Sequence, residues 1–177
     1  MDRVSVEWAG PGGAPEPGTR TRSHPDGTPR GTLTGVSTGC VFCGIAGGHI
    51  PARIVDADDD VVAFLDTSPL LPGHVLVMPR AHHETLDELP TALLAPLFSA
   101  VKRVSIAVQA AMPADGSFVA VNTRVSQSVA HLHVHVVPRR HKDGLFSPKL
   151  VWHRRPYPSE SEADAVAERI KRALKPV

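Results

Sequence analysis

The strongest constraint on the fold is a short stretch in which histidine and apolar residues alternate. Residues 131–137 read His-Leu-His-Val-His-Val-Val. Successive side chains of a β-strand point to opposite faces, so the three histidines share one face and Leu132, Val134 and Val136 share the other. The pattern predicts a strand over 131–138 with its apolar face on the core. It also predicts three imidazoles within about 14 Å on the opposite face.

Three interpretations of this histidine face are open from the residues alone. It is a solvated polar face, a metal site made only of imidazoles, or a reactive site. In a reactive site an imidazole acts as nucleophile or as acid and base, and its neighbours keep it neutral and oriented. Charging all three rings together would be repulsive, which makes an unused cluster of this kind costly.

The two cysteines, Cys40 and Cys43, form a Cys-x-x-Cys pair. Two cysteines are too few for a disulfide scaffold, and no charged segment followed by an apolar stretch marks a signal peptide. We therefore expect a cytoplasmic protein with reduced thiols. Three interpretations of the pair are open: half of a zinc site, two buried thiols without a further role, or a redox pair. The redox form needs a preceding strand, whereas residues 31–39 are rich in Gly, Thr and Ser.

Glycine and proline divide the chain unevenly. Residues 1–36 contain 7 Gly and 5 Pro and almost no periodic apolar pattern. Such a segment buries too little apolar surface to offset the entropy of ordering it, so we expect a flexible tail. Residues 37–177 are expected to form one domain, with 141–177 as a C-terminal extension.

The remaining pattern predicts an α+β fold. Helical spacing predicts a short turn at 41–46, a long helix at 91–111 and a last helix that begins after Ser159. We expect Pro96 to kink the long helix or delay its start. Predicted strands cover residues 53–56, 61–65, 74–78 and 118–121, with an edge strand at 149–153. Short turns between strands imply an antiparallel sheet of about five strands.

Charge and hydropathy argue against two classes of partner. The 19 basic and 18 acidic residues leave a net charge of +1, which does not suit binding to nucleic acid by charge neutralisation. No apolar run exceeds five residues, so we expect no membrane span.

Several motifs in fixed order resemble the histidine triad (HIT) superfamily of nucleotide hydrolases and transferases. The stretch Gln-Ser-Val-Ala-His-Leu-His-Val-His at 127–135 carries most of the resemblance. Upstream, the Cys-Val-Phe-Cys-Gly-Ile at 40–45, the Ala-Phe-Leu-Asp-Thr-Ser-Pro at 63–69 and the Pro-Gly-His-Val-Leu-Val-Met-Pro-Arg at 72–80 occur in the family's order. The resemblance covers about residues 40–140 and implies a HIT-like fold.

The resemblance implies a division of labour in the histidine strand. His133 is the nucleophile that attacks the α-phosphorus and forms a nucleotidyl-histidine intermediate, which water then resolves. Its second nitrogen needs a fixed acceptor, for which a backbone carbonyl near His131 is the candidate. His135 donates to the phosphoryl oxygens. Gln127 and Ser128 orient the phosphate and water and protonate the leaving group.

The resemblance also implies binding and metal residues. Asp66 matches the position that binds the ribose hydroxyls, Asn122 matches a polar position near the sugar and phosphate, and the base slot is lined by Val41, Phe42, Ile45 and Phe64. Cys40, Cys43, His82 and His131 match the positions that hold a structural zinc ion in some members. His83 is the alternative to His82 if the register slips by one.

We therefore expect a phosphoramidase-like hydrolase or transferase that acts on purine nucleotides such as AMP conjugates. A dinucleoside polyphosphate hydrolase or phosphorylase is the enzymatic alternative. A non-catalytic nucleotide sensor and a pure zinc protein are alternatives of other classes. The resemblance also implies a homodimer, for which the apolar residues of 93–108 are candidates, although they suit an intrachain core equally well.

Two segments depart from the family pattern. The loop 123–126 lacks the family's glycines, whose backbone N–H groups help to hold phosphate, and Arg124 is a candidate to supply charge instead. The basic run 152–155 is either a contact for an acidic leaving group or a solvated edge strand.

Overall fold

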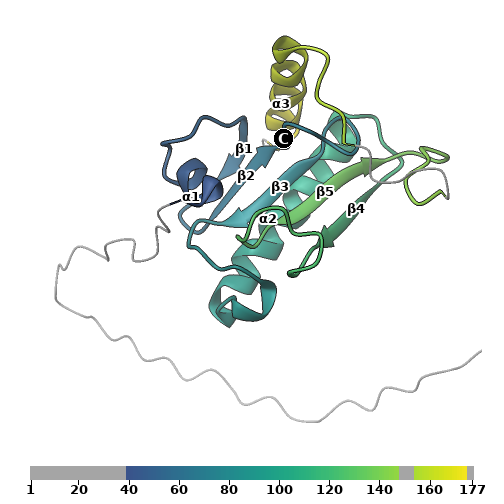
Figure 1. The fold of residues 1–177 in the computed structure, drawn as a ribbon. Coiled ribbons are helices and arrows are strands. Elements are labelled where there is room, and N and C mark those ends of the chain that lie inside the picture. Colours follow the sequence, from purple (N-terminus) through teal and green to yellow (C-terminus); the bar gives the residue numbers. More distant parts are fainter. Residues whose placement is uncertain (1–38, 148–153, 175–177) are drawn as a thin grey trace, which may run out of the picture. The chain divides into compact units, whose positions relative to one another are not determined.

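An antiparallel sheet forms the centre of the fold (Figure 1). The computed structural model describes residues 39–147 and 154–174, which all fall in one unit of the chain, Thr32–Val177. In these residues five strands lie in the order β1-β2-β3-β5-β4. Their bounds are β1 Ile54–Ala57, β2 Val61–Leu65, β3 Val75–Pro79, β4 Gly116–Val121 and β5 Val134–Arg139. The predicted α+β class is confirmed, whereas the predicted tail at 1–36 and edge strand at 149–153 lie outside the described residues.

The helices follow the predicted order. They are α1 (Val41–Ala46), α2 (Thr91–Ala111) and α3 (Glu160–Leu174), with a short 3₁₀ turn, η1, at Leu86–Glu88. Gly47 caps α1. Before α3, the Ser159 hydroxyl accepts a hydrogen bond from the Glu162 N–H at 3.1 Å, as an N-cap residue does.

Of the two effects expected of Pro96, a kink or a later start of the long helix, the later start is wrong. Helix α2 begins at Thr91 and contains Pro96. A proline lacks the N–H that would bond to the residue four positions earlier, so the helix loses one hydrogen bond there. Burial of Leu97, Val101 and Val104 immediately beyond it compensates, because these side chains enter the core against the sheet.

The sheet is covered on both faces, which explains why every residue of β2 and β3 is buried. Alternate residues of β2, such as Ala63, join the core made with α2 and α3. The residues between them, such as Phe64, pack with Phe42 of α1 on the other face. Helix α1 is thus placed on the opposite side of the sheet from α2 and α3.

The histidine stretch keeps its predicted alternation, although the strand is shorter than predicted. Strand β5 begins at Val134 rather than His131, because β3 pairs only with Val134–Val136. Ahead of it, the Leu132 N–H donates to the His83 carbonyl at 2.6 Å. Leu132 nevertheless belongs to the α2 core, and the histidines face the α1 side.

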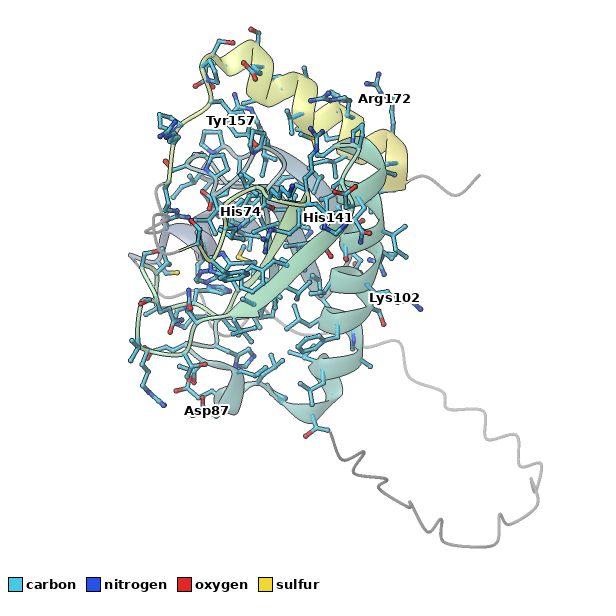
Figure 2. All side chains as sticks on the ribbon, turned by 90° about the vertical axis from the view of Figure 1, so that its right-hand side faces the viewer. His74, Asp87, Lys102, His141, Tyr157 and Arg172 are labelled. Carbon is cyan, nitrogen blue, oxygen red and sulfur yellow. The ribbon has the colours of Figure 1, made fainter. Side chains whose placement is uncertain are left out.

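By length and composition alone, α2 could cross a membrane. The core helix of a soluble protein passes the same test, so the finding is weak. Here Leu97, Val104 and Val108 are fully buried against the sheet. Figure 2 shows Lys102 of α2 pointing away from the fold, whereas His74 lies inside it.

Candidate active site and metal centre

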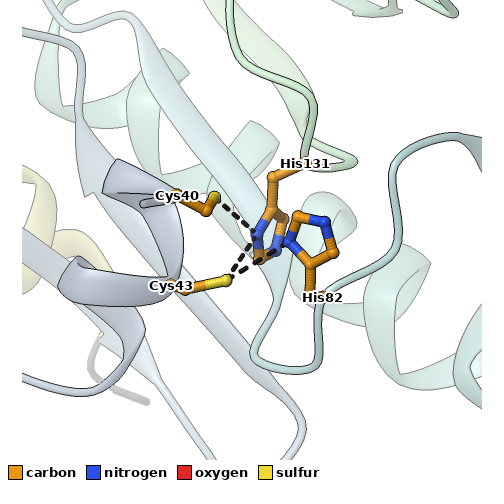
Figure 3. A group of neighbouring side chains, drawn as sticks. All are labelled: Cys40, Cys43, His82 and His131. Carbon is orange, nitrogen blue, oxygen red and sulfur yellow. Dashed lines mark hydrogen bonds between the residues drawn. The ribbon is translucent and has the colours of Figure 1, made fainter. Parts of the chain in front are cut away.

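Two cysteines and two histidines from distant parts of the chain converge beside α1 (Figure 3). Cys40 precedes α1 and Cys43 lies within it, His82 follows β3 and His131 precedes β5. Their ligand atoms all lie within 4.8 Å of one another. The cluster contains His82, as the first of the two predicted registers requires, and not His83.

The distances and the protonation of His131 suit a tetrahedral metal. His131 Nδ1 lies 3.6 Å from the Sγ atoms of both Cys40 and Cys43. Zinc–sulfur bonds of about 2.3 Å and zinc–nitrogen bonds of about 2.0 Å at a tetrahedral angle put the two ligand atoms about 3.5 Å apart. The His131 Nε2–H donates to the Pro79 carbonyl at 2.9 Å, which leaves a lone pair on Nδ1 for a metal.

His133 is oriented by its own strand. Its Nδ1–H donates to the main-chain carbonyl of His131 at 2.7 Å. Since Nδ1 holds the proton, Nε2 of the neutral ring carries the lone pair. The His133 side chain is buried, and this burial holds the pKa below its ordinary value, against the hydrogen bond to the carbonyl, which raises it. The structure therefore contains the backbone acceptor that the sequence analysis requires.

A cavity beside His133 collects most of the predicted binding residues. It has a volume of about 300 Å³, within the range of small-molecule sites. The predicted residues that line it, besides His133, are Val41, Phe42, Ile45, Phe64, Asp66 and Ser128. Phe42 meets the His133 ring edge-on at 5.1 Å between ring centres. The apolar slot, the carboxylate and the imidazole therefore open onto the same space.

His135 is linked to a second buried histidine. His74 Nδ1 accepts a hydrogen bond from the Leu70 N–H at 3.3 Å and lies 3.2 Å from the Asp66 carboxylate. The other ring nitrogen, Nε2, lies 3.0 Å from His135 Nδ1, and the two rings share one hydrogen bond there. His135 Nε2 lies 3.4 Å from the side-chain nitrogen of Asn122.

Burial keeps both rings of this pair neutral. It is the main cause that lowers the pKa of His74 to about 3 and that of His135 to about 4. For His74 the nearby Asp66 carboxylate opposes the shift, but burial outweighs it. A neutral His135 still carries one ring N–H that can donate a hydrogen bond.

Two of the polar residues singled out from the sequence point elsewhere. The amide of Gln127 donates to the Glu84 carbonyl at 2.6 Å and accepts from the Arg124 N–H at 2.8 Å, so it holds loops together outside the cavity. Arg124 extends to Asp87, 3.2 Å away. Arg124 and Ser126 both have φ near +60° in place of the expected glycines.

The sequence indicates no site role for one residue of the site and only a general one for another. The sequence alone assigns no role to His74, yet its ring bonds to His135. Its position directly before β3, in which Leu76 pairs with His135, was the available signal. Arg154 lines the cavity and forms an ion pair with Asp66. Its sequence signal was only the basic run at 152–155, of which Trp152 and His153 lie outside the described residues.

Comparison with known proteins finds a matching family and several relatives. The HIT domain family matches residues 47–142. The adenylylsulfatase HINT3 of Arabidopsis thaliana is 33% identical over 137 residues, which cover 76% of this chain and 69% of the relative. The adenosine 5′-monophosphoramidase hnt1 of Schizosaccharomyces pombe is 31% identical over 137 residues, covering 77% of this chain and 98% of the relative.

A solved structure extends the likeness to the fold. It is a zinc-bound histidine triad family protein of Mycobacterium smegmatis, 32% identical to this chain. The match has a TM-score of 0.66 and covers 77% of this chain and 93% of the other.

Proposed function

This chain belongs to the HIT domain family, and we propose that it hydrolyses purine nucleotide phosphoramidates, esters or anhydrides at the α-phosphorus. The observation that carries the proposal is the neutral His133, whose Nδ1–H is held by the His131 carbonyl at 2.7 Å while the ring lines a cavity with Asp66 and Phe42. Two relatives, named adenylylsulfatase and adenosine 5′-monophosphoramidase, support the substrate class.

The reaction proceeds in two displacements. Nε2 of His133 attacks the α-phosphorus, a phosphorus–nitrogen bond forms, and the bond to the leaving amine, alcohol or acid breaks. The leaving group departs with a proton, for which the Ser128 hydroxyl in the cavity is the candidate donor. Water then attacks the same phosphorus and its proton returns to the Ser128 oxygen. The phosphorus–histidine bond breaks, and the nucleoside monophosphate is released with His133 neutral again. The Nδ1 hydrogen bond stabilises the positive ring that forms meanwhile.

The remaining cavity residues divide into binding and charge stabilisation. In the tautomer whose Nδ1 accepts from His74 Nε2, the Nε2–H of His135 donates to a phosphoryl oxygen as negative charge develops. Phe42, Phe64 and Ile45 supply an apolar slot for the base. Asp66 is the candidate acceptor for ribose hydroxyls.

We also propose that Cys40, Cys43, His82 and His131 hold a structural zinc ion. The donor set and the 3.6 Å separations of His131 Nδ1 from both sulfur atoms support it. Four protein ligands leave no open position for water, so the ion supplies rigidity rather than a nucleophile. His131 is kept neutral, and the carbonyl that orients His133 is held in place.

The decisive experiment compares His133→Asn with His141→Asn, which replaces an exposed histidine outside the cavity. With adenosine 5′-phosphoramidate, we expect His133→Asn to lose turnover by at least about 10³-fold and His141→Asn to match the wild type. Mass spectrometry of quenched wild-type protein should detect an adenylyl adduct that is missing in His133→Asn. Full turnover by His133→Asn would exclude this mechanism.

The same assay separates the alternatives. Release of a nucleoside diphosphate only when inorganic phosphate is added would indicate a phosphorylase. Tight AMP binding without turnover or adduct would indicate a sensor module, and metal without nucleotide binding would indicate a pure zinc protein.

A further inference from the structure

One residue of the cavity comes from outside the part of the chain that matches the family. The match ends at residue 142, yet the side chain of Arg154 lines the cavity together with His133 and Asp66. The C-terminal extension therefore contributes to the site rather than only covering the sheet.

The segment that carries Arg154 is fixed to the fold at two points. The Arg155 N–H donates to the Pro69 carbonyl at 3.2 Å. The Tyr157 hydroxyl accepts a hydrogen bond from the Gly73 N–H at 3.0 Å. Both acceptor and donor belong to the turn before β3, so the segment is anchored beside the turn that ends at His74.

The guanidinium of Arg154 uses only part of its hydrogen-bond donors within the described residues. Its Nη2 pairs with Asp66 Oδ2, and among the described residues Asp66 is its one hydrogen-bond partner. Arginine has five N–H donors in a planar fork. The Asp66 side chain is 6% exposed and that of Arg154 is 39% exposed. The buried carboxylate thus holds one part of the guanidinium while the rest stays accessible.

Arg154 is also the one Lys or Arg side chain among the residues that line this cavity. Arg124, the candidate from the sequence, is turned toward Asp87. Burial is the main cause of the low pKa of His135, and the positive charge of Arg154 adds to it. An anionic substrate at His133 therefore meets a single fixed cation in the described part of the cavity.

We propose that Arg154 is a substrate-binding residue whose guanidinium pairs with a phosphate group of the bound nucleotide. Arginine suits this task because its fork matches two phosphate oxygens, and a carboxylate behind it keeps the fork oriented. The inference rests on the proposed function, since it assumes that the cavity takes a nucleotide. The phosphate is the reacting 5′ group or one carried on the ribose.

The test measures binding of adenosine, 5′-AMP and 3′-AMP to the full chain by calorimetry. Arg154→Gln should raise the Kd of one or both nucleotides by about tenfold or more, while adenosine changes by less than about twofold. Weaker binding of 5′-AMP by the variant assigns Arg154 to the reacting phosphate. Weaker binding of 3′-AMP alone assigns it to a phosphate on the ribose. Arg154→Lys, which keeps the charge but not the fork, should lose less.

Arg155→Gln is the matched control, because it removes the neighbouring exposed charge and should leave all three Kd values unchanged. If Arg154→Gln and Arg154→Lys raise the Kd of adenosine as much as the Kd of both nucleotides, Arg154 only shapes the cavity. Unchanged or tighter nucleotide binding would also overturn the inference.

Failure of the inference is distinguishable from failure of the proposed function. Wild-type protein that binds 5′-AMP and cleaves the phosphoramidate, with Arg154→Gln equal to it in every Kd, contradicts the role of Arg154 alone. Wild-type protein that binds none of the three compounds contradicts both.

Discussion

His131 and His133 are joined through the main-chain carbonyl of His131, which accepts the Nδ1–H of His133 at 2.7 Å. The ring of His131 meanwhile lies 3.6 Å from both cysteine sulfur atoms. One residue therefore serves the metal cluster with its side chain and the nucleophile with its backbone. If the cluster loses its order, His131 should shift, and the carbonyl that orients His133 should shift with it.

Zinc removal should therefore lower both stability and nucleotide binding. A ligand at about 100 times its Kd adds about 2.7 kcal/mol to the free energy of unfolding. For a chain of this size that corresponds to about 5–10 °C in Tm. We expect about one zinc per chain by elemental analysis, and a fall in Tm of this size after chelation or in Cys43→Ser.

Readdition of zinc separates loss of metal from damage to the chain. It should restore Tm and 5′-AMP binding in the chelated wild type but not in Cys43→Ser. Purified protein that holds no zinc, or an unchanged Tm after complete chelation, would contradict a structural metal.

The buried pair of His74 and His135 should make the fold sensitive to acid. Their pKa values, lowered mainly by burial to about 3 and about 4, lie below the ordinary 6.5. Below pH 6.5 the unfolded chain binds protons that the folded chain does not, so stability falls as pH falls. Each histidine contributes up to about 1.4 kcal/mol per pH unit, until the pH reaches its folded pKa.

Urea unfolding at a series of pH values between 7.5 and 4.5 measures this slope. The slope reports how many more protons the unfolded chain binds than the folded chain. His74→Asn should lower this number by up to about one, whereas His141→Asn, at an exposed position, should leave it unchanged. A free energy of unfolding that stays constant from pH 7 to pH 5 would contradict two neutral buried rings.

Elements that depend on local pattern could be predicted from the sequence, and contacts that depend on chain path could not. Alternation placed Leu132 on the core side of the sheet, and residue spacing identified helix α2. The link between His74 and His135 depends on how β3 pairs with β5. The pair of Arg154 and Asp66 joins residues 88 positions apart, and no periodicity reports where that segment runs.

The same limit applies to the homodimer that the resemblance implies. Of the candidate helix residues, Leu97, Val101, Val104 and Val108 belong to the intrachain core, with Leu93 packed against it. They are therefore not free to bind a second copy.

Other apolar residues remain exposed where α2 meets the edge strand β4. Leu94, Phe98 and Val119 are 38–42% exposed. Val119 shares a sheet face with Ser117, whose hydroxyl lies 2.7 Å from that of Ser105 on α2. The exposed side of α2 and the β4 edge thus form one surface suited to a second copy of the chain.

We expect the protein to be a homodimer through this surface, as measured by size-exclusion chromatography with light scattering. Phe98→Asp should shift the mass toward one chain, because a charge at a packed apolar contact is left without a partner. Ile106→Asp, at a 59% exposed position further along α2, is the matched control and should stay dimeric. A wild-type mass of one chain across the accessible concentration range would exclude the dimer. If Phe98→Asp remains a dimer, the interface does not include Phe98 and lies on another surface.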